Sequence, residues 1–164
     1  IHDGQIAQVG TPDEVYNEPA TPFVYSFLGA VNVLPVDVSD GHVVLDGFET
    51  SLPAAWPHGF EGAANLYVRA HDLELSDDRA RSIPGVVRTS RRLAGLVRLE
   101  VEIPGGHGPL SVELPEAVVD GRLRLAPGTR VLLRPRRYGV FPRGCEPGES
   151  NGWITAEPRL AAVS

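Results

Sequence analysis

Residues 97–114 read VRLEVEIPGGHGPLSVEL, and this alternation of apolar and polar side chains is typical of two β-strands joined by a turn. The apolar positions lie two residues apart on each side of a Gly- and Pro-rich turn and are Val97, Leu99, Val101, Ile103, Leu110, Val112 and Leu114. Charged and small polar residues occupy the positions between them. The pattern predicts a hairpin at 96–115 with one face in the core and the other in water.

The same two-residue period continues through most of the chain after residue 31. It predicts further strands at 32–38, 42–45, 48–52, 65–75 and 130–141, with residues 53–63 as a loop. The 18 glycines and 15 prolines are spread along the chain, which favours short elements joined by tight turns. We therefore predict an all-β barrel or sandwich.

The first 30 residues carry helix signals instead. Thr11, Pro12 and Glu14 form a helix-start signature, because Thr can cap the first turn, Pro suits the first helical position, and Glu follows three residues after the cap. A second start lies at Thr21-Pro22, and Gly29 offers a stop. The apolar residues of this second helix fall at helical spacing and are Phe23, Val24, Phe27 and Leu28. A short helical leader with an apolar face is expected before the β structure.

Composition bounds the class of protein. The 164 residues are 42% hydrophobic, as in a soluble globular protein, and no apolar run approaches the roughly 20 residues that cross a bilayer. The chain begins at Ile1 and contains no Met, so we expect a piece of a longer protein. Cys145 is the single cysteine, which is compatible with a reducing compartment. The net charge of −6, with no basic stripe carrying interleaved aromatics, argues against a nucleic-acid-binding OB protein.

One group of side chains suggests binding chemistry. Arg130, Arg134, Arg136 and Arg137 form a basic strand, and guanidinium groups suit a tetrahedral oxyanion. The alternative, which we favour, is a solvated face paired with carboxylates such as Glu100, Glu102 and Glu113. The five histidines show no metal-ligand spacing. His71 and Asp72 are not expected to act together, because adjacent residues of a strand point to opposite faces.

The opening of the chain contains a distinctive run: residues 4–16, GQIAQVGTPDEVY, then Pro19-Ala20 and the spaced Phe23, Val24, Phe27, Leu28 and Gly29. This run resembles the end of the nucleotide-binding domain in importer-type ABC ATPases. In that family this run leads from the ATPase core into a C-terminal β domain of the TOBE or OB-like type. Asn32 also fits, because an Asn commonly opens that domain.

Residues 68–75 read VRAHDLEL. They are similar to the Arg-Pro-His-Asp motif of the sulfate and thiosulfate importer subunits within that family, with Ala70 where Pro is usual. Residues 95–101 and 134–137 are similar as well. Polyamine, iron and sugar importers share the architecture, so the same domain from one of those importers is an alternative, as is a small-oxyanion-sensing module.

The resemblance implies three parts and a set of partners. Residues 1–30 are expected to be the tail of the ABC nucleotide-binding domain, 31–143 the TOBE/OB-like regulatory β domain, and 144–164 a loosely ordered C-terminal extension. The implied partners are a second copy of the ATP-binding subunit, transmembrane permease subunits contacted through the ATPase domain, and a regulatory protein or oxyanion effector. The implied location is the cytoplasmic face of the bacterial inner membrane.

Catalysis is not expected of this chain by itself. It contains no Gly-x-x-x-x-Gly-Lys-Ser/Thr loop to cradle phosphates and no Leu-Ser-Gly-Gly-Gln signature, and it has no lysine at all. ATP and Mg²⁺ therefore belong to the full-length parent, with no catalytic, cofactor or metal residue here. The candidate effector or interface residues are Arg69, His71, Arg134, Arg136 and Arg137.

Overall fold

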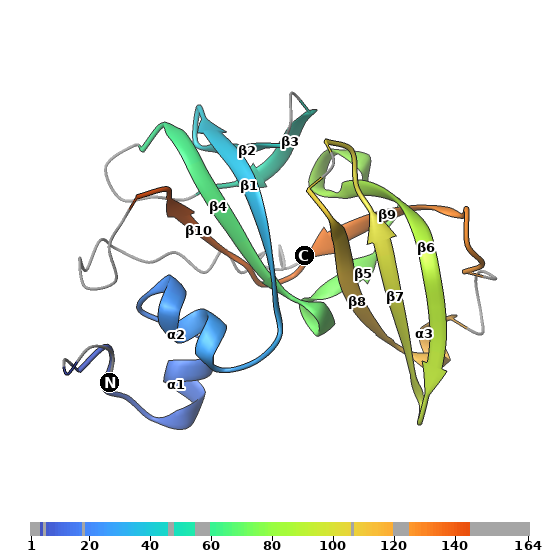
Figure 1. Cartoon of the computed structure of the whole chain (residues 1–164). Helices are drawn as coiled ribbons and strands as arrows, with labels where there is room; N and C mark the ends of the chain where they lie inside the picture. Colours follow the sequence, from blue (N-terminus) through green and yellow to red (C-terminus); the bar gives the residue numbers. More distant parts are fainter. Residues whose placement is uncertain are drawn as a thin grey trace, which may run out of the picture.

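The protein consists of two five-stranded antiparallel sheets preceded by two short helices (Figure 1). The computed structural model describes residue 4 and residues 6–17, 19–45, 48–54, 60–105, 107–119 and 125–144. The prediction of an all-β fold with a short helical leader is confirmed. The strands predicted at 65–75 and 130–141 are each divided between the two sheets.

The helical leader consists of α1 (Pro12–Asn17) and α2 (Pro22–Phe27). Both helix starts are confirmed: the Glu14 N–H donates to Thr11 Oγ1 at 3.3 Å, and the Thr11 N–H donates to the Glu14 carboxylate at 2.8 Å. The apolar face of α2 differs from the prediction. Val24 and Tyr25 are buried, whereas Phe27 is 75% exposed. The helix buries the side that packs on the sheets, and a tyrosine occupies part of that side.

The first sheet has the strand order β10-β4-β1-β2-β3. Its strands are β1 (Val31–Ser39), β2 (His42–Leu45), β3 (Phe48–Pro53), β4 (Gly62–Arg69) and β10 (Gly139–Pro142). The turn between β1 and β2 places Asp40 and Gly41 at φ 50° and 72°. Positive φ at both central residues matches the right-handed twist of a hairpin, which explains the Asp-Gly pair.

The second sheet has the strand order β5-β9-β6-β7-β8. Its strands are β5 (Leu73–Leu75), β6 (Ile83–Leu93), β7 (Leu96–Glu102), β8 (Pro109–Pro115) and β9 (Arg130–Pro135), with the short helices η2 (Arg79–Arg81) and α3 (Glu116–Val119). The predicted hairpin is confirmed as β7 and β8, and all seven of its apolar positions are buried. Strand β6 was not predicted, because its outer half is exposed on both faces and shows no alternation.

Two predicted strands are each divided between the sheets. Residues 65–75 are not one strand: β4 ends at Arg69, the 3-10 turn η1 (Ala70–Asp72) follows, and β5 begins the second sheet. Residues 130–141 likewise separate into β9 and β10, which lie in different sheets. The chain therefore crosses between the sheets at 70–72 and again at 136–138. We call these segments the two crossovers.

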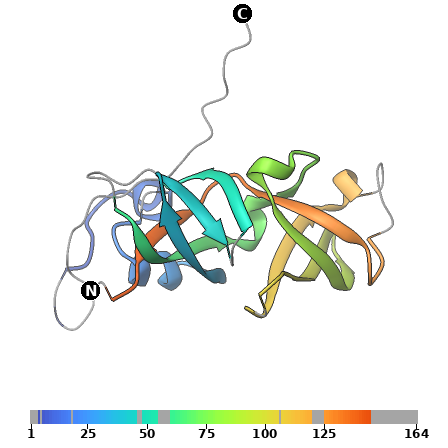
Figure 2. The same ribbon diagram turned by 90° about the horizontal axis from the view of Figure 1, so that it is seen from above.

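The sheets lie side by side and share one buried apolar cluster (Figure 2). Asn32, at the start of β1, bonds edge strand β8 twice: its amide donates to the Ser111 carbonyl and its oxygen accepts from the Ser111 N–H, each at 2.8 Å. On the second crossover, the buried Tyr138 hydroxyl donates to the Pro53 carbonyl at 2.7 Å. Burial raises the pKa of Tyr138 well above its ordinary value.

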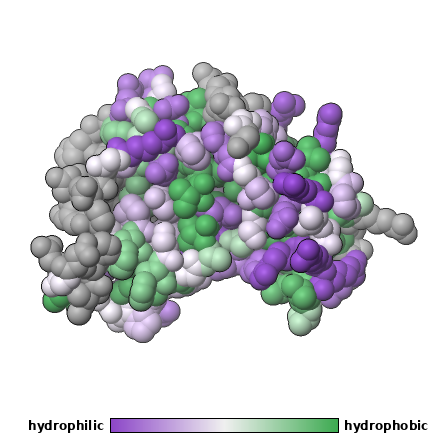
Figure 3. All heavy atoms as spheres, in the orientation of Figure 1, coloured by the Kyte–Doolittle hydropathy of each residue, from purple (hydrophilic) through white to green (hydrophobic). Residues whose placement is uncertain are grey.

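The surface of the second sheet is polar over β7 and β8 and apolar at the tip of the β6–β7 hairpin. Hydrophilic side chains gather over β7 and β8 (Figure 3), where Arg98 pairs with Glu113 at 2.5 Å. Leu93 and Leu96, at the tip of the β6–β7 hairpin, are 51% and 44% exposed. No helix in the described part of the chain is long and apolar enough to cross a bilayer.

Candidate functional site

A cluster of polar and aromatic side chains lies where the helical leader meets the two crossovers. We call it the junction cluster. Its members come from α1, α2, the end of β4, η1 and the second crossover, and they are Tyr16, Asn17, Tyr25, Arg69, His71, Asp72 and Arg137. Three of the five candidate residues, Arg69, His71 and Arg137, are therefore brought together, whereas the side chains of Arg134 and Arg136 lie beside Glu74.

Arg69 forms the centre of the junction cluster. It is only 4% exposed, and its guanidinium carbon lies 4.0 Å from the Tyr16 ring centroid and 4.4 Å from that of Tyr25. A guanidinium held between two aromatic faces away from water gains on the order of 2 kcal/mol per good contact. Because Tyr16 belongs to α1 and Tyr25 to α2, Arg69 attaches both helices to the end of β4.

The Arg69 side chain is not fully satisfied by hydrogen bonds. Its Nε and Nη2 atoms are buried and have no hydrogen-bond partner within the described residues. The Asp72 Oδ2 atom is also buried and has no hydrogen-bond partner within the described residues. Buried polar groups without partners cost free energy, so the aromatic contacts and the neighbouring charges must offset that cost.

Asp72 connects the two crossovers. It is 1% exposed, and its Oδ1 accepts from Arg137 Nε at 3.1 Å. Arg137 also donates to the Asn17 side chain at the end of α1. In addition, the Arg136 N–H donates to the Asp72 carbonyl at 2.8 Å. These bonds join η1, the second crossover and α1 at one point.

His71 occupies the exposed edge of the cluster. Its Nε2 lies 3.1 Å from the Tyr16 hydroxyl and 3.8 Å from Asp72 Oδ2. The expectation that His71 and Asp72 point to opposite faces is wrong, because η1 replaces the extended strand on which it depended. No group of three or more metal-ligating side chains occurs among the described residues.

Burial and the neighbouring charges of the cluster shift the pKa of Tyr25. Burial raises the pKa of the Tyr25 hydroxyl to about 12; the nearby positive charge of Arg69 opposes the shift, and the negative charge of Asp72 adds to it. The phenol therefore stays protonated at neutral pH. The junction cluster holds no nucleophile activated by a base, and its arrangement suits positioning of the leader rather than bond chemistry.

Arg134 and Arg136 lie beside Glu74 and not beside the carboxylates expected from the sequence. Arg134 forms a two-pronged ion pair with Glu74, and Arg136 Nε lies 4.0 Å from the same carboxylate. Strand β5 pairs with β9, so Glu74 is directly opposite Arg134. Glu113 pairs with Arg98 instead.

Several junction residues were missed by sequence reasoning. No local pattern indicates Tyr16 and Tyr25 as partners of Arg69, or Asn17 as a partner of Arg137. Tyr25 follows Val24 inside a helix whose start was recognised, and a tyrosine beside the apolar stripe was the available signal. Its contact with a residue 44 positions later was not encoded in any local pattern.

Comparison with known proteins adds a second line of evidence. Residues 77–136, which contain β6 to β9, match the family model described as a TOBE-like domain. The sulfate/thiosulfate import ATP-binding protein CysA of Mesorhizobium japonicum is 43% identical over 87% of this chain and 39% of its own length. CysA 2 of Rhizobium meliloti is 40% identical over 86% of this chain and 37% of its own.

A further curated relative is similar to most of this chain. CysA of Brucella melitensis is 40% identical over 88% of this chain and 38% of its own length. The chain thus spans about two fifths of the length of the curated relatives that it matches. Among solved structures, the cytoplasmic molybdate-binding protein ModG aligns over 77% of this chain and 96% of its own, with a TM-score of 0.49 and 18% identity.

Proposed function

We propose that this chain, which carries a TOBE-like domain and matches the C-terminal region of the sulfate/thiosulfate import ATP-binding proteins, regulates such a subunit in a bacterial importer. The identity of 43% over 87% of the chain is the observation that carries the proposal. In the parent protein, ATP and Mg²⁺ would be bound and ATP hydrolysed by the remaining part of the subunit.

We also propose that the chain has the three parts expected from the sequence. Residues 1–30 are the tail of the nucleotide-binding domain, 31–143 form the regulatory domain, and 144–164 are a C-terminal extension. The loose order expected of that extension concerns residues 145–164, which lie outside the described residues. The junction cluster supports this division, because Arg69 and Arg137 attach α1 and α2 to both crossovers. A displacement of the leader would reach both sheets through these contacts.

The proposed partners are a second copy of the subunit and, through the ATPase part, the transmembrane permeases at the cytoplasmic face of the membrane. The exposed Leu93 and Leu96, together with Val118 at 47% exposure, favour a protein contact at the tip of the second sheet. Arg134 and Arg136 are proposed as ion-pair partners of Glu74 and not as a site for an oxyanion effector.

A chimaera tests the proposal. The ATPase part of the Mesorhizobium japonicum relative, joined to this chain in place of its own C-terminal region, is expressed in a strain that lacks its own sulfate importer subunit. We expect growth on sulfate as the sole sulfur source. The proposal fails if the chimaera accumulates normally and hydrolyses ATP, yet supports no sulfate uptake.

The junction cluster is tested in the same chimaera. Arg69→Leu removes the guanidinium between Tyr16 and Tyr25, and we expect less sulfate uptake for each ATP hydrolysed. Arg88→Gln, an exposed arginine on β6, is the matched control and should leave that ratio unchanged. Equal ratios in the two variants would show that the junction cluster does not couple the leader to the sheets.

A further inference from the structure

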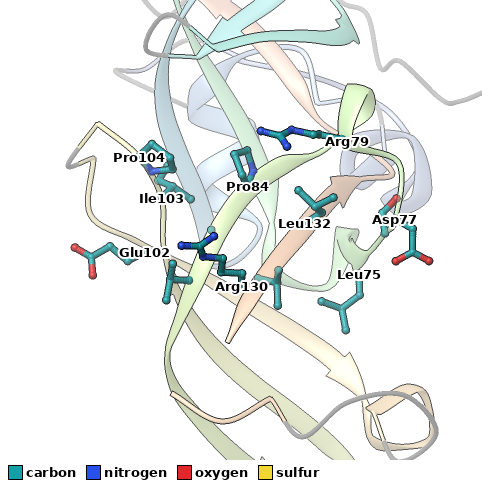
Figure 4. A pocket seen from close by; sticks show the side chains of 13 residues that line it. Leu75, Asp77, Arg79, Pro84, Glu102, Ile103, Pro104, Arg130 and Leu132 are labelled. Carbon is teal, nitrogen blue, oxygen red and sulfur yellow. The ribbon is translucent and has the colours of Figure 1, made fainter. Parts of the chain in front are cut away.

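A pocket of about 790 Å³ lies on the outer face of the second sheet, away from the junction cluster. Its floor comes from neighbouring strands: Pro84 pairs with Leu132, and Val86 pairs with Arg130 across β6 and β9. Ile103 and Pro104, after β7, form one wall, and Arg79 of η2 forms another (Figure 4). The volume lies within the range of 300–1,000 Å³ typical of small-molecule sites.

The basic and acidic side chains around the pocket point in different directions. In Figure 4 the guanidinium groups of Arg79 and Arg130 lie on the two sides of the Pro84 ring, whereas the Glu102 carboxylate extends away from the pocket. Asp77 lies beyond Leu132, on the far side. The space beside Pro84 therefore faces the Arg130 guanidinium and an apolar floor, and the carboxylates of Glu102 and Asp77 point away from it.

The register explains why Arg130 keeps its charge available. Val86 pairs with Glu102 on one side and Arg130 on the other, so the two charged residues are separated by two strand spacings, about 10 Å between backbones. Within the described part of the chain, Arg130 forms no ion pair or side-chain hydrogen bond. It differs in this from Arg134, the next arginine of β9, which pairs with Glu74.

We infer that this pocket binds a small organic anion, with a carboxylate or sulfonate head held by Arg130 and an apolar body on Pro84, Val86 and Leu132. Guanidinium groups bind such heads through charge-assisted hydrogen bonds, and the floor excludes water from the body. The site does not depend on the proposed transport function.

The test is an NMR titration of the 164-residue chain, following backbone amide shifts at constant ionic strength. Benzoate and benzenesulfonate are the probes, benzamide is the neutral analogue, and inorganic sulfate is the head group alone. We expect saturable shifts at Val86, Arg130 and Leu132 with at least one organic anion, and none with benzamide or sulfate. Equal binding of benzamide or sulfate, or no saturable shift with either organic anion, overturns the inference.

Variants locate the site. Arg130→Gln should weaken binding of the organic anion by about tenfold, the loss of one charge-assisted interaction. Arg88→Gln, on the same sheet but outside the pocket, should change it less than twofold. Val86→Trp fills the pocket from an exposed position and should abolish binding while the thermal unfolding curve stays cooperative. Unchanged binding in Arg130→Gln would place the anion elsewhere and refute the assignment.

Discussion

At the scale of single residues, the junction cluster shows how burial decides protonation. Tyr25 is 4% exposed, and its pKa of about 12 lies above the ordinary value of 10.0. A phenol whose pKa is raised by folding stabilises the fold fully below pH 10. That contribution is lost as the pH rises from 10 to about 12, since the unfolded chain then ionises more easily than the folded one.

Tyr25→Phe removes this dependence. We expect the free energy of unfolding of the parent chain to fall more steeply above pH 10 than that of the variant, by up to about 1.4 kcal/mol per pH unit. Urea unfolding at pH 9 and pH 11 measures how the free energy of unfolding of each protein changes with pH. Tyr138 is present in both proteins, so its ionisation affects both measurements equally. Identical losses in the two chains would contradict the assigned shift.

At the scale of elements, edge strand β8 is covered by a side chain and not by another strand. The Asn32 amide occupies both the N–H and the carbonyl of Ser111, as a neighbouring strand would. This contact links the start of the first sheet to the edge of the second. It gives a structural reason for an asparagine at the opening of the β domain.

Asn32→Ala should lower the free energy of unfolding by about 1–3 kcal/mol, because Ser111 loses both partners. Asn65→Ala on β4 is the matched control, since Asn65 is half-buried to a similar degree and no side-chain hydrogen bond is recorded for it among the described residues. Urea unfolding measures both variants. A loss no greater than that of the control would show that the bridge contributes nothing to stability.

At the scale of the whole molecule, two antiparallel sheets follow a leader of two short helices. The chain has no phosphate-binding loop and no lysine. We expect calorimetric titration of the purified chain with Mg-ATP to show no binding, while the chimaera with the relative's ATPase part binds ATP under the same conditions. Micromolar affinity of the isolated chain would contradict this expectation.

Local pattern was enough for the hairpin and the helix caps. Residues 97–103 and 110–114 each keep a period of two because one face of β7 and β8 is core. Thr11 and Thr21 cap helices through bonds that span three residues. The family resemblance also rested on contiguous residues. Such features are determined by neighbours in the chain, so the sequence by itself specifies them.

Only the tertiary structure decided where strands change sheets and which charges meet. The alternation of 65–75 is interrupted at His71-Asp72 and that of 130–141 at Arg136-Arg137, but a polar pair inside an apolar segment does not specify that its two halves pair in different sheets. The breaks bring Asp72 to Arg137 and leave Arg134 opposite Glu74. Contacts between residues more than 40 positions apart depend on strand pairing, and pairing is chosen by the packing of the whole chain.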